Sequence, residues 1–403
     1  MFKLFVIGIA DTMLSTQQES LLARSVLIVG ARRFEEMVSH LPVRFLNITP
    51  LPEALAAIGS HLQQGNVAVL ASGDPLFYGI GRRLLAEFPE EIIEISPALS
   101  SVQRACALFR IPWDDAFVTS LHGRTSSHLP GLLLGHAKNV ILTDANHSPD
   151  RIARQILDYL QFIGEDELKE TIRMMVAEDI GLASEKVFYG TLQEGSTQRF
   201  SPLNILCLLM PAAAALPDYR FGLTEDLLHH SRGLITKNEV RAATLHQLRL
   251  PESGVFWDIG AGSGSLSIEA ARANPALTVY AVEQKDEELQ NIKNNIVKFR
   301  SFNIVPVPGR APEALNRLPA PDRIFVGGSS GSLAAIIELA AARLPAGGLL
   351  VINGVIDKTV QEAPPLMEKF GFSVTTSVID VTRTEPGGKA KRFNPITIMT
   401  GRR

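Results

Sequence analysis

The chain has 403 residues, of which 46% are hydrophobic, and a formal net charge of −3 at pH 7. This length predicts two or three domains, each large enough to bury a core. The charge argues against a nucleic-acid-binding protein that depends on a global positive field. Cys106 and Cys207 both lie in apolar runs and are expected to be buried free thiols in a reducing cytoplasm. No C-x-x-C or His/Cys cluster predicts a metal site, and no apolar run is long enough for a signal peptide or a membrane span.

Strands and helices alternate through most of the first half. Short apolar runs that end in glycine or turn residues predict strands at 3–8, 25–29, 67–71, 92–95 and 140–142. Apolar residues at helical spacing predict helices at 51–62, 76–85, 100–109 and 150–160. Ser100 is the expected N-cap of the third of these helices. From residue 172 onwards strands dominate, at 172–176, 186–189 and 203–210.

A proline-bracketed run of small residues, 211–218, interrupts these patterns and is typical of a linker. We therefore expect one domain over residues 1–212, a linker over 213–220 and a second domain over 221–403. In the second domain, Thr236 and Glu239 have the spacing of a capping box at the start of a helix. The strands and helices that follow predict a doubly wound α/β sheet of seven strands, closed by an antiparallel pair.

The most informative stretch of the second domain is a strand, a glycine loop and a helix. Asp258 ends the strand, the glycines have the pattern G-x-G-x-G, and Glu283 ends the next strand. The dinucleotide fingerprint is G-x-G-x-x-G, so this spacing instead resembles the S-adenosylmethionine (SAM) loop of Rossmann-like class I methyltransferases. We expect Glu283 to hold the ribose hydroxyls. The other expected contacts are the loop glycines and two residues at the adenine edge: Gly260, Gly262, Gly264, Arg310 and Ala311.

Both halves also resemble the family of decarboxylating precorrin-6Y methyltransferases of cobalamin biosynthesis, in which a tetrapyrrole methylase domain is fused to a SAM-dependent methyltransferase domain. In the first half the resemblance lies in Ser72-Gly-Asp-Pro75, Ser100-Ser101 and Leu121-His-Gly-Arg124, and in the second half in 234–241 and the Asp258 loop. One departure concerns Gly8-Ile-Ala-Asp11, where many tetrapyrrole methylases have G-x-G-P-G. This departure leaves the substrate contacts of that loop open.

The resemblance implies a two-lobed α/β fold of class III methyltransferases for the first half and one SAM bound by each half. The first half would methylate ring carbon 5 of the precorrin. The second half would methylate ring carbon 15 and remove carbon dioxide from the acetate arm of ring C. Residues implied for the first SAM site are Gly73, Asp74, Pro75 and Ser101. Residues implied on the substrate side are His122, Arg124, Thr236 and Lys237.

The tetrapyrrole substrate that the resemblance implies is a polycarboxylate, so cations should line its site. Four cations lie between the last two predicted strands and are candidates, with a solvated hairpin tip as the alternative: Arg383, Lys389, Lys391 and Arg392. Relatives also suggest a homo-oligomer, and we expect no nucleic acid or membrane partner. Two other functions stay open. The first half could be a non-catalytic tetrapyrrole-binding or dimerisation module, and the glycine loop alone would also suit a nucleic-acid methyltransferase.

Overall fold

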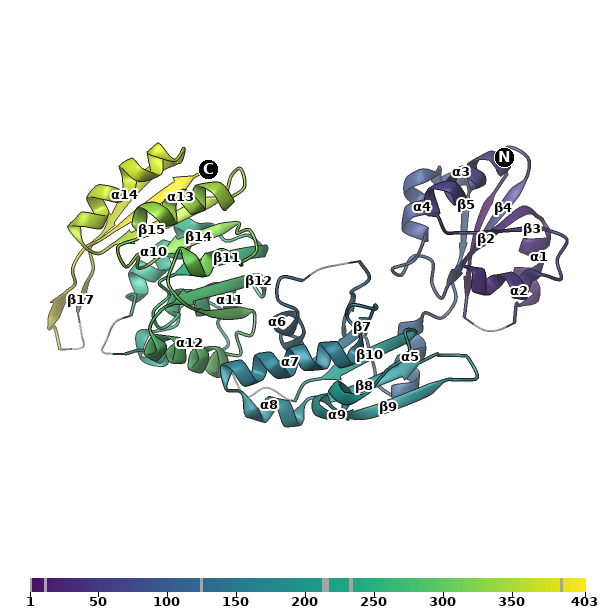
Figure 1. Cartoon of the computed structure of the whole chain (residues 1–403), viewed down its shortest axis with the longest axis horizontal. Helices are drawn as coiled ribbons and strands as arrows, with labels where there is room; N and C mark the ends of the chain where they lie inside the picture. Colours follow the sequence, from purple (N-terminus) through teal and green to yellow (C-terminus); the bar gives the residue numbers. More distant parts are fainter. Residues whose placement is uncertain (1, 11–12, 124–125, 212–216, 232–234, 385–386) are drawn as a thin grey trace. The chain divides into compact units, whose positions relative to one another are not determined.

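The structure is a computed structural model that describes residues 2–10, 13–123, 126–211, 217–231, 235–384 and 387–403 (Figure 1). The chain forms two compact units. The first comprises Met1–Arg124, Lys138–Arg151 and Arg173–Leu209, and the second comprises Thr125–Ala137, Ile152–Ile172 and Met210–Arg403. The second unit therefore includes two segments from the first half of the sequence. Residues 213–216 of the expected linker, and the preceding residue 212, lie outside the described residues.

The first unit begins with a parallel five-stranded sheet in the order β3-β2-β4-β1-β5. Its strands are β1 (Leu4–Ile9), β2 (Ser25–Gly30), β3 (Arg44–Asn47), β4 (Asn66–Ser72) and β5 (Ile93–Ser96). Its helices are α1 (Thr16–Ala23), α2 (Glu35–Val38), α3 (Leu51–His61) and α4 (Gly81–Glu87). The expected helix from residue 76 starts only at Gly81, because Tyr78 has a φ of 53° and the preceding residues form a turn. Parallel strands bring the ends of β1, β4 and β5 to one edge.

A second, mixed sheet completes the first unit in the order β6-β7-β10-β8-β9. Its strands are β6 (Phe117–Ser120), β7 (Lys138–Leu142), β8 (Arg173–Glu178), β9 (Lys186–Thr191) and β10 (Asn204–Leu209). Two helices accompany it, α5 (Ser101–Phe109) and α9 (Leu192–Thr197). The hydroxyl of Ser100 accepts from the N–H of Gln103, which confirms the predicted N-cap of α5. Cys106 and Cys207 are buried free thiols in one apolar cluster, and burial raises the pKa of Cys207 to about 12.

The segments of the first half that belong to the second unit carry α6 (Leu129–Leu134), α8 (Asp166–Thr171) and most of α7 (Pro149–Ile163). Buried Tyr159 donates to the carbonyl oxygens of Phe302 and Ile304, at 3.0 and 2.7 Å. Nε2 of His128 lies 3.0 Å from the Phe302 carbonyl oxygen, and burial lowers the pKa of this histidine to about 4. These hydrogen bonds fasten α7 and the start of α6 to the edge of the C-terminal sheet.

That C-terminal sheet has seven strands in the order β13-β12-β11-β14-β15-β19-β16. The strands are β11 (Ser253–Ile259), β12 (Ala276–Glu283), β13 (Ile304–Pro308), β14 (Arg323–Val326), β15 (Leu349–Gly354), β16 (Ser373–Ile379) and β19 (Ile396–Arg402). The first five strands in this order are parallel, whereas β19 runs antiparallel to both β15 and β16. A small hairpin of β17 (Thr382–Thr384) and β18 (Ala390–Arg392) is inserted between β16 and β19.

Helices cover both faces of this sheet (Figure 1). They are α10 (Asn238–Leu248), α11 (Ser265–Ala273), α12 (Asp286–Phe299), α13 (Leu333–Arg343) and α14 (Asp357–Lys369). Side chains alternate along β11, so Trp257 packs in one core with α13 and α14. Asp258 points to the opposite face, where it binds Ser267 of α11. None of the helices in the described ranges has the length and hydropathy that crossing a bilayer requires.

Candidate active sites

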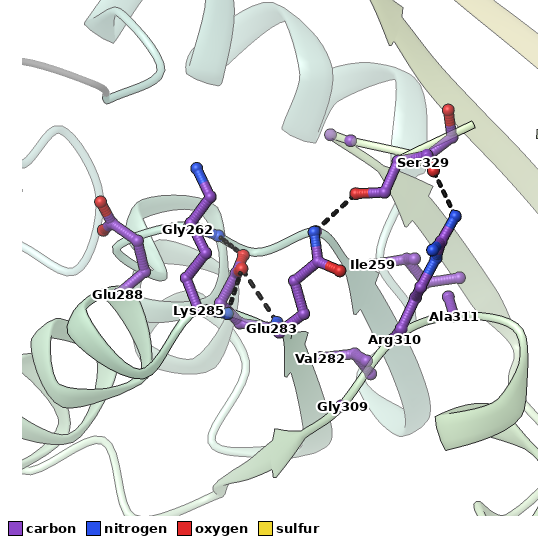
Figure 2. A pocket seen from close by; sticks show the side chains of 15 residues that line it. Ile259, Gly262, Val282, Glu283, Lys285, Glu288, Gly309, Arg310, Ala311 and Ser329 are labelled. Carbon is purple, nitrogen blue, oxygen red and sulfur yellow. Dashed lines mark hydrogen bonds between the residues drawn. The ribbon is translucent and has the colours of Figure 1, made fainter. Parts of the chain in front are cut away.

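A pocket of about 310 Å³ lies at the carboxyl ends of β11, β12, β13 and β14 (Figure 2). Five of the six cofactor residues predicted in this half line it: Gly260, Gly262, Glu283, Arg310 and Ala311. The other lining residues are Ile259, Val282, Gln284, Lys285, Glu288, Gly309, Gly327, Gly328, Ser329 and Ser330. The sequence places these residues together because the carboxyl ends of parallel strands share one edge of the sheet.

The three glycines of the loop have different structural roles. Gly260 has a φ of 68°, and a Cβ there would lie 2.5 Å from the carbonyl oxygen of Gly328. Gly262 has a φ of 55°, and a Cβ would meet no atom within 4 Å. Gly264 is buried at the N-cap of α11, where a Cβ would lie 3.0 Å from Cγ1 of Ile292. Gly260 therefore permits a close backbone approach, Gly262 leaves the pocket open, and Gly264 turns the chain into the helix.

The carboxylate of Glu283 is fixed by backbone donors beside Gly262 (Figure 2). Oε2 accepts from the N–H of Gly262 at 2.9 Å, and Oε1 accepts from Gln284 and Lys285 at 2.9 and 3.0 Å. An ionised carboxylate has about four acceptor positions, so the three N–H groups leave Oε2 able to accept once more. An acceptor held in this way on the pocket wall suits a hydroxyl of a ribose.

Asp258 lies beneath the glycine loop and is fully buried. Oδ2 accepts from Oγ of Ser267 at 2.5 Å, while Oδ1 has no partner among the described residues. Burial raises the pKa of this carboxyl to about 7, and the hydrogen bond from Ser267 opposes the rise. Asp258 is not among the lining residues of the pocket, and its hydrogen bond goes to α11, the helix that follows the glycine loop.

Three loops meet at Ser330 on one side of the pocket. The guanidinium Nη2 of Arg310 donates to the Ser330 carbonyl oxygen at 2.5 Å. Nε2 of Gln284 donates to the Ser330 hydroxyl at 2.7 Å. Arg310 is thus anchored to the loop after β14, and is not a freely solvated arginine. Sequence reasoning missed Ser330 and Gln284, although the run Gly327-Gly-Ser-Ser-Gly331 after a strand marks a loop at this edge.

The capping box predicted at Thr236 and Glu239 does not form. Helix α10 begins at Asn238, with Lys237 as an N-cap whose side chain makes no capping hydrogen bond. The Glu239 carboxylate instead accepts from Arg383, with Nε to Oε1 at 2.8 Å and Nη2 to Oε2 at 2.7 Å. Nζ of Lys237 lies 2.8 Å from Oε2 of Glu225. The ion pairs replace the local cap because a bidentate contact with arginine gives the Glu239 carboxylate two charge-assisted hydrogen bonds, whereas a capping box would give it one from a backbone N–H.

Ion pairs among the described residues also separate the four predicted cations into two that are paired with carboxylates and two that are not. Arg383 binds Glu225 and Glu239, and Arg392 binds Asp380. Two of the four cations are therefore committed to carboxylates of the chain itself. Lys391 lies 5.2 Å from the ring centroid of Phe393, and Lys389 is exposed.

The residues predicted for the other SAM site gather at the carboxyl edge of the first sheet. Gly73 follows β4 with a φ of 62°, and a Cβ there would lie 2.9 Å from Cα of Ser100. The turn after β4 is closed by Asp74, whose Oδ1 accepts from the N–H of Leu76 at 2.8 Å. Pro75 is the next residue of this turn, and Ser101 is the exposed first residue of α5.

The remaining predicted residues of the first half are less defined. Gly8, near the end of β1, lies close to the loop at Gly73, because a Cβ at Gly8 would lie 2.1 Å from the Gly73 carbonyl oxygen. His122 is exposed after β6, with Nδ1 3.5 Å from Oγ of Ser120. Asp11 and Arg124 lie outside the described residues.

Comparison with known proteins finds two domain families in the chain. Residues 10–195 match the tetrapyrrole (corrin/porphyrin) methylases, and residues 227–401 match the precorrin methyltransferase domain. A precorrin-6Y C(5,15)-methyltransferase (decarboxylating) from Sinorhizobium sp is 31% identical over 98% of this chain and 95% of its own length. Its namesake from Mycobacterium tuberculosis is 29% identical over 87% of each chain. A protein from Pyrobaculum calidifontis, named a probable cobalt-precorrin-6B C(15)-methyltransferase (decarboxylating), is 36% identical over 44% of this chain and 94% of its own.

Proposed function

The chain belongs to the family of precorrin-6Y C(5,15)-methyltransferases (decarboxylating), and we propose on this basis that it acts on a precorrin. It methylates ring carbons 5 and 15 and removes carbon dioxide from the acetate side chain of ring C, giving precorrin-8. Family membership makes the chain a SAM-dependent methyltransferase. It also argues against the nucleic-acid methyltransferase that the glycine loop alone left open. The observation that carries the proposal is the similarity to one fused relative along almost the whole chain.

The C-terminal pocket fits SAM by its shape and its donors and acceptors. A Cβ at Gly262 would meet no protein atom, and Glu283 presents a fixed acceptor beside it. We infer that Glu283 holds a ribose hydroxyl and that Arg310 and Ala311 border the adenine, as in class I Rossmann-like methyltransferases. When bound, SAM supplies an electrophilic methyl group. The chain has to place the acceptor carbon in line with this group and exclude water.

For the substrate we infer an apolar and cationic surface at the same edge of the sheet. Val355 and Ile356 follow β15, and each is 61% exposed. Exposed neighbouring apolar side chains suit the flat macrocycle and would keep water from the departing carboxylate. Lys389 and Lys391 would bind the carboxylate arms. Thr236 and Lys237 precede α10, which begins at this edge, and we propose that they face the substrate.

In the first half we propose a second SAM site of the class III type at the turn after β4. Gly73, Asp74 and Pro75 would contact the cofactor, with Ser101 at the start of α5 beside them. His122 and Arg124 would meet substrate carboxylates. On this proposal residues 1–212 methylate carbon 5 and residues 221–403 methylate carbon 15 and decarboxylate. The homo-oligomeric state and the cytoplasmic location stay predictions.

The test is mass spectrometry of the product formed from reduced precorrin-6 and SAM that carries a ¹³C methyl group. The proposal predicts two labelled methyl groups and the loss of one carbon dioxide. One labelled methyl with loss of carbon dioxide would mean that the first half is a binding or dimerisation module. An unchanged substrate would contradict the assigned reaction.

A further inference from the structure

The β17–β18 hairpin extends from the same edge of the C-terminal sheet as the SAM pocket. Strand β19 is antiparallel to both β15 and β16, so β15 and β16 run in the same direction. The hairpin follows the carboxyl end of β16, at Ile379. It therefore begins at the edge where β11, β12, β13 and β14 end at the pocket, and it projects away from the sheet (Figure 1).

One side chain, Arg383 of β17, ties this hairpin to a segment about 150 residues earlier in the chain. Its Nε and Nη2 donate to the two carboxylate oxygens of Glu239, at 2.8 and 2.7 Å. Nη2 also donates to Oε1 of Glu225 at 2.5 Å. Glu225 and Glu239 lie on either side of Thr236 and Lys237, the residues expected to face the substrate. Arg383 thus fastens the hairpin to the start of α10.

The partial burial of Arg383 favours a stable ion pair over a solvent-exposed one that forms and breaks readily. The side chain of Arg383 is 32% exposed and that of Glu225 is 18% exposed. The hydrogen bonds from Arg383 are the largest cause of the lowered pKa of Glu239, and burial opposes them. Burial also acts to raise the pKa of Glu225, but the hydrogen bonds and charges of Lys237 and Arg383 together lower it. Three cations also surround the ring of Phe393, since Lys237, Arg383 and Lys391 lie 5.5, 5.1 and 5.2 Å from its centroid.

The charges of this cluster leave part of the hairpin available to an anion. Glu225 and Glu239 neutralise Arg383 and Lys237. The ammonium group of Lys391 lies over the face of Phe393 and has no carboxylate partner among the described residues, and Lys389 is exposed near the tip. A ring face attracts a cation without neutralising its charge, so Lys391 can still bind a carboxylate.

We propose that Arg383 is a positioning residue for the substrate. By clamping the β17–β18 hairpin to Glu225 and Glu239, it holds Lys389 and Lys391 at the pocket edge, where they bind carboxylate arms of the tetrapyrrole. This inference rests on the proposed function and adds to it the element that selects a polycarboxylate. Nε and Nη2 of Arg383 are used by the two glutamates, so the role that we assign to Arg383 is to hold the hairpin and not to bind the substrate itself.

The test compares Arg383→Ala and Arg383→Lys with Arg392→Gln in the full chain. Arg392 is the matched control because it lies on the same hairpin but pairs with Asp380, which is outside the α10 segment. Three quantities are measured: the KM and kcat for the precorrin, the Kd for SAM by calorimetry, and amide hydrogen exchange of the hairpin. The Kd for SAM reports whether each variant retains a folded C-terminal domain.

For Arg383→Ala we expect faster exchange over residues 382–392 and a KM raised about tenfold, as for one lost charge-assisted contact, with kcat and the SAM Kd changed less than about twofold. Arg383→Lys keeps the charge but loses the bidentate contact, so its KM should lie between those of the wild type and the alanine variant. Arg392→Gln should leave exchange of the start of α10 and the KM near wild type.

Unchanged exchange in Arg383→Ala would overturn the clamp. Faster exchange with an unchanged KM would overturn the role in substrate binding. A wild type that does not methylate the precorrin would contradict the proposed function and the substrate role together, while the exchange rates would still decide whether the clamp exists.

Discussion

Replacing Gly262 with alanine should abolish most SAM binding at the C-terminal site while leaving the domain folded. Gly262 lines the pocket, and an added Cβ would meet no protein atom within 4 Å. The methyl group would therefore occupy space that the ligand needs. Gly347 provides the matched control, because it also has a positive φ, 80°, and free space around a Cβ. It precedes β15 and so lies at the opposite edge of the sheet.

The expected magnitudes follow from the backbone conformation and from the pocket. An alanine in a left-handed conformation costs about 1–2 kcal/mol, so both variants should lose about that much stability. This corresponds to a melting temperature lower by about 2–8 °C for a domain of this size. Only Gly262→Ala should lose affinity, by at least about tenfold, since a displaced ligand loses more than ~1.4 kcal/mol.

The assay is isothermal titration of SAM into the full chain, with Asp74→Ala as a common background so that only the C-terminal site is observed. Differential scanning calorimetry gives the stability of the same samples. Equal SAM affinity in Gly262→Ala and Gly347→Ala would refute the assignment of this pocket to the cofactor. A loss of affinity in both variants would show that strain alone, and not occupation of the pocket, weakens binding.

Three further predictions concern single side chains. Glu283→Gln should weaken SAM binding about tenfold, because an amide nitrogen cannot accept from the Gly262 N–H; calorimetry measures this. Asp258 has a folded pKa of about 7 and an unfolded pKa of about 4, so the folded state binds the extra proton between these values. The stability of the wild type relative to Asp258→Asn should therefore fall as the pH rises from about 4 to about 7 and then level off. Urea unfolding, followed by the fluorescence of buried Trp257, measures this difference. Tyr159→Phe leaves two carbonyl oxygens near β13 without their buried donor and should cost about 1–3 kcal/mol of stability, measured by the same unfolding; an unchanged stability would contradict the docking of α7.

The gathering of the candidate cofactor residues around one pocket was predictable because its signal is local. Asp258, the glycine loop and Glu283 belong to consecutive strand ends of a parallel sheet, and the alternation of strands and helices determines where such ends meet. Arg310 and Ala311 follow the next strand, so the same rule placed them at the pocket. The loop after β14 carries no side chain with a specific signal, and Ser330 was therefore missed.

Most of the failures concern interactions between distant residues, and one concerns the conformation of a single residue. Thr236 and Glu239 have the spacing of a capping box, but Arg383 is 144 residues from Glu239 and captures its carboxylate. The start of α4 was placed too early because the left-handed conformation of Tyr78 has no sequence signal. Tyr159 lies within the helix predicted at 150–160, and nothing nearby in the sequence shows that it binds carbonyl groups at and just before a strand about 145 residues later.

The most direct test of the account is the product mass of the two single-site variants, Asp74→Ala and Gly262→Ala, with reduced precorrin-6 and ¹³C-methyl SAM at a concentration well below the weakened Kd of the Gly262→Ala site. The account predicts that each variant adds one labelled methyl group where the wild type adds two, and that only Asp74→Ala still removes carbon dioxide. Loss of both methyl groups in either variant, or two methyl groups in Gly262→Ala, would contradict the claim that the chain contains two separate methyl-transfer sites.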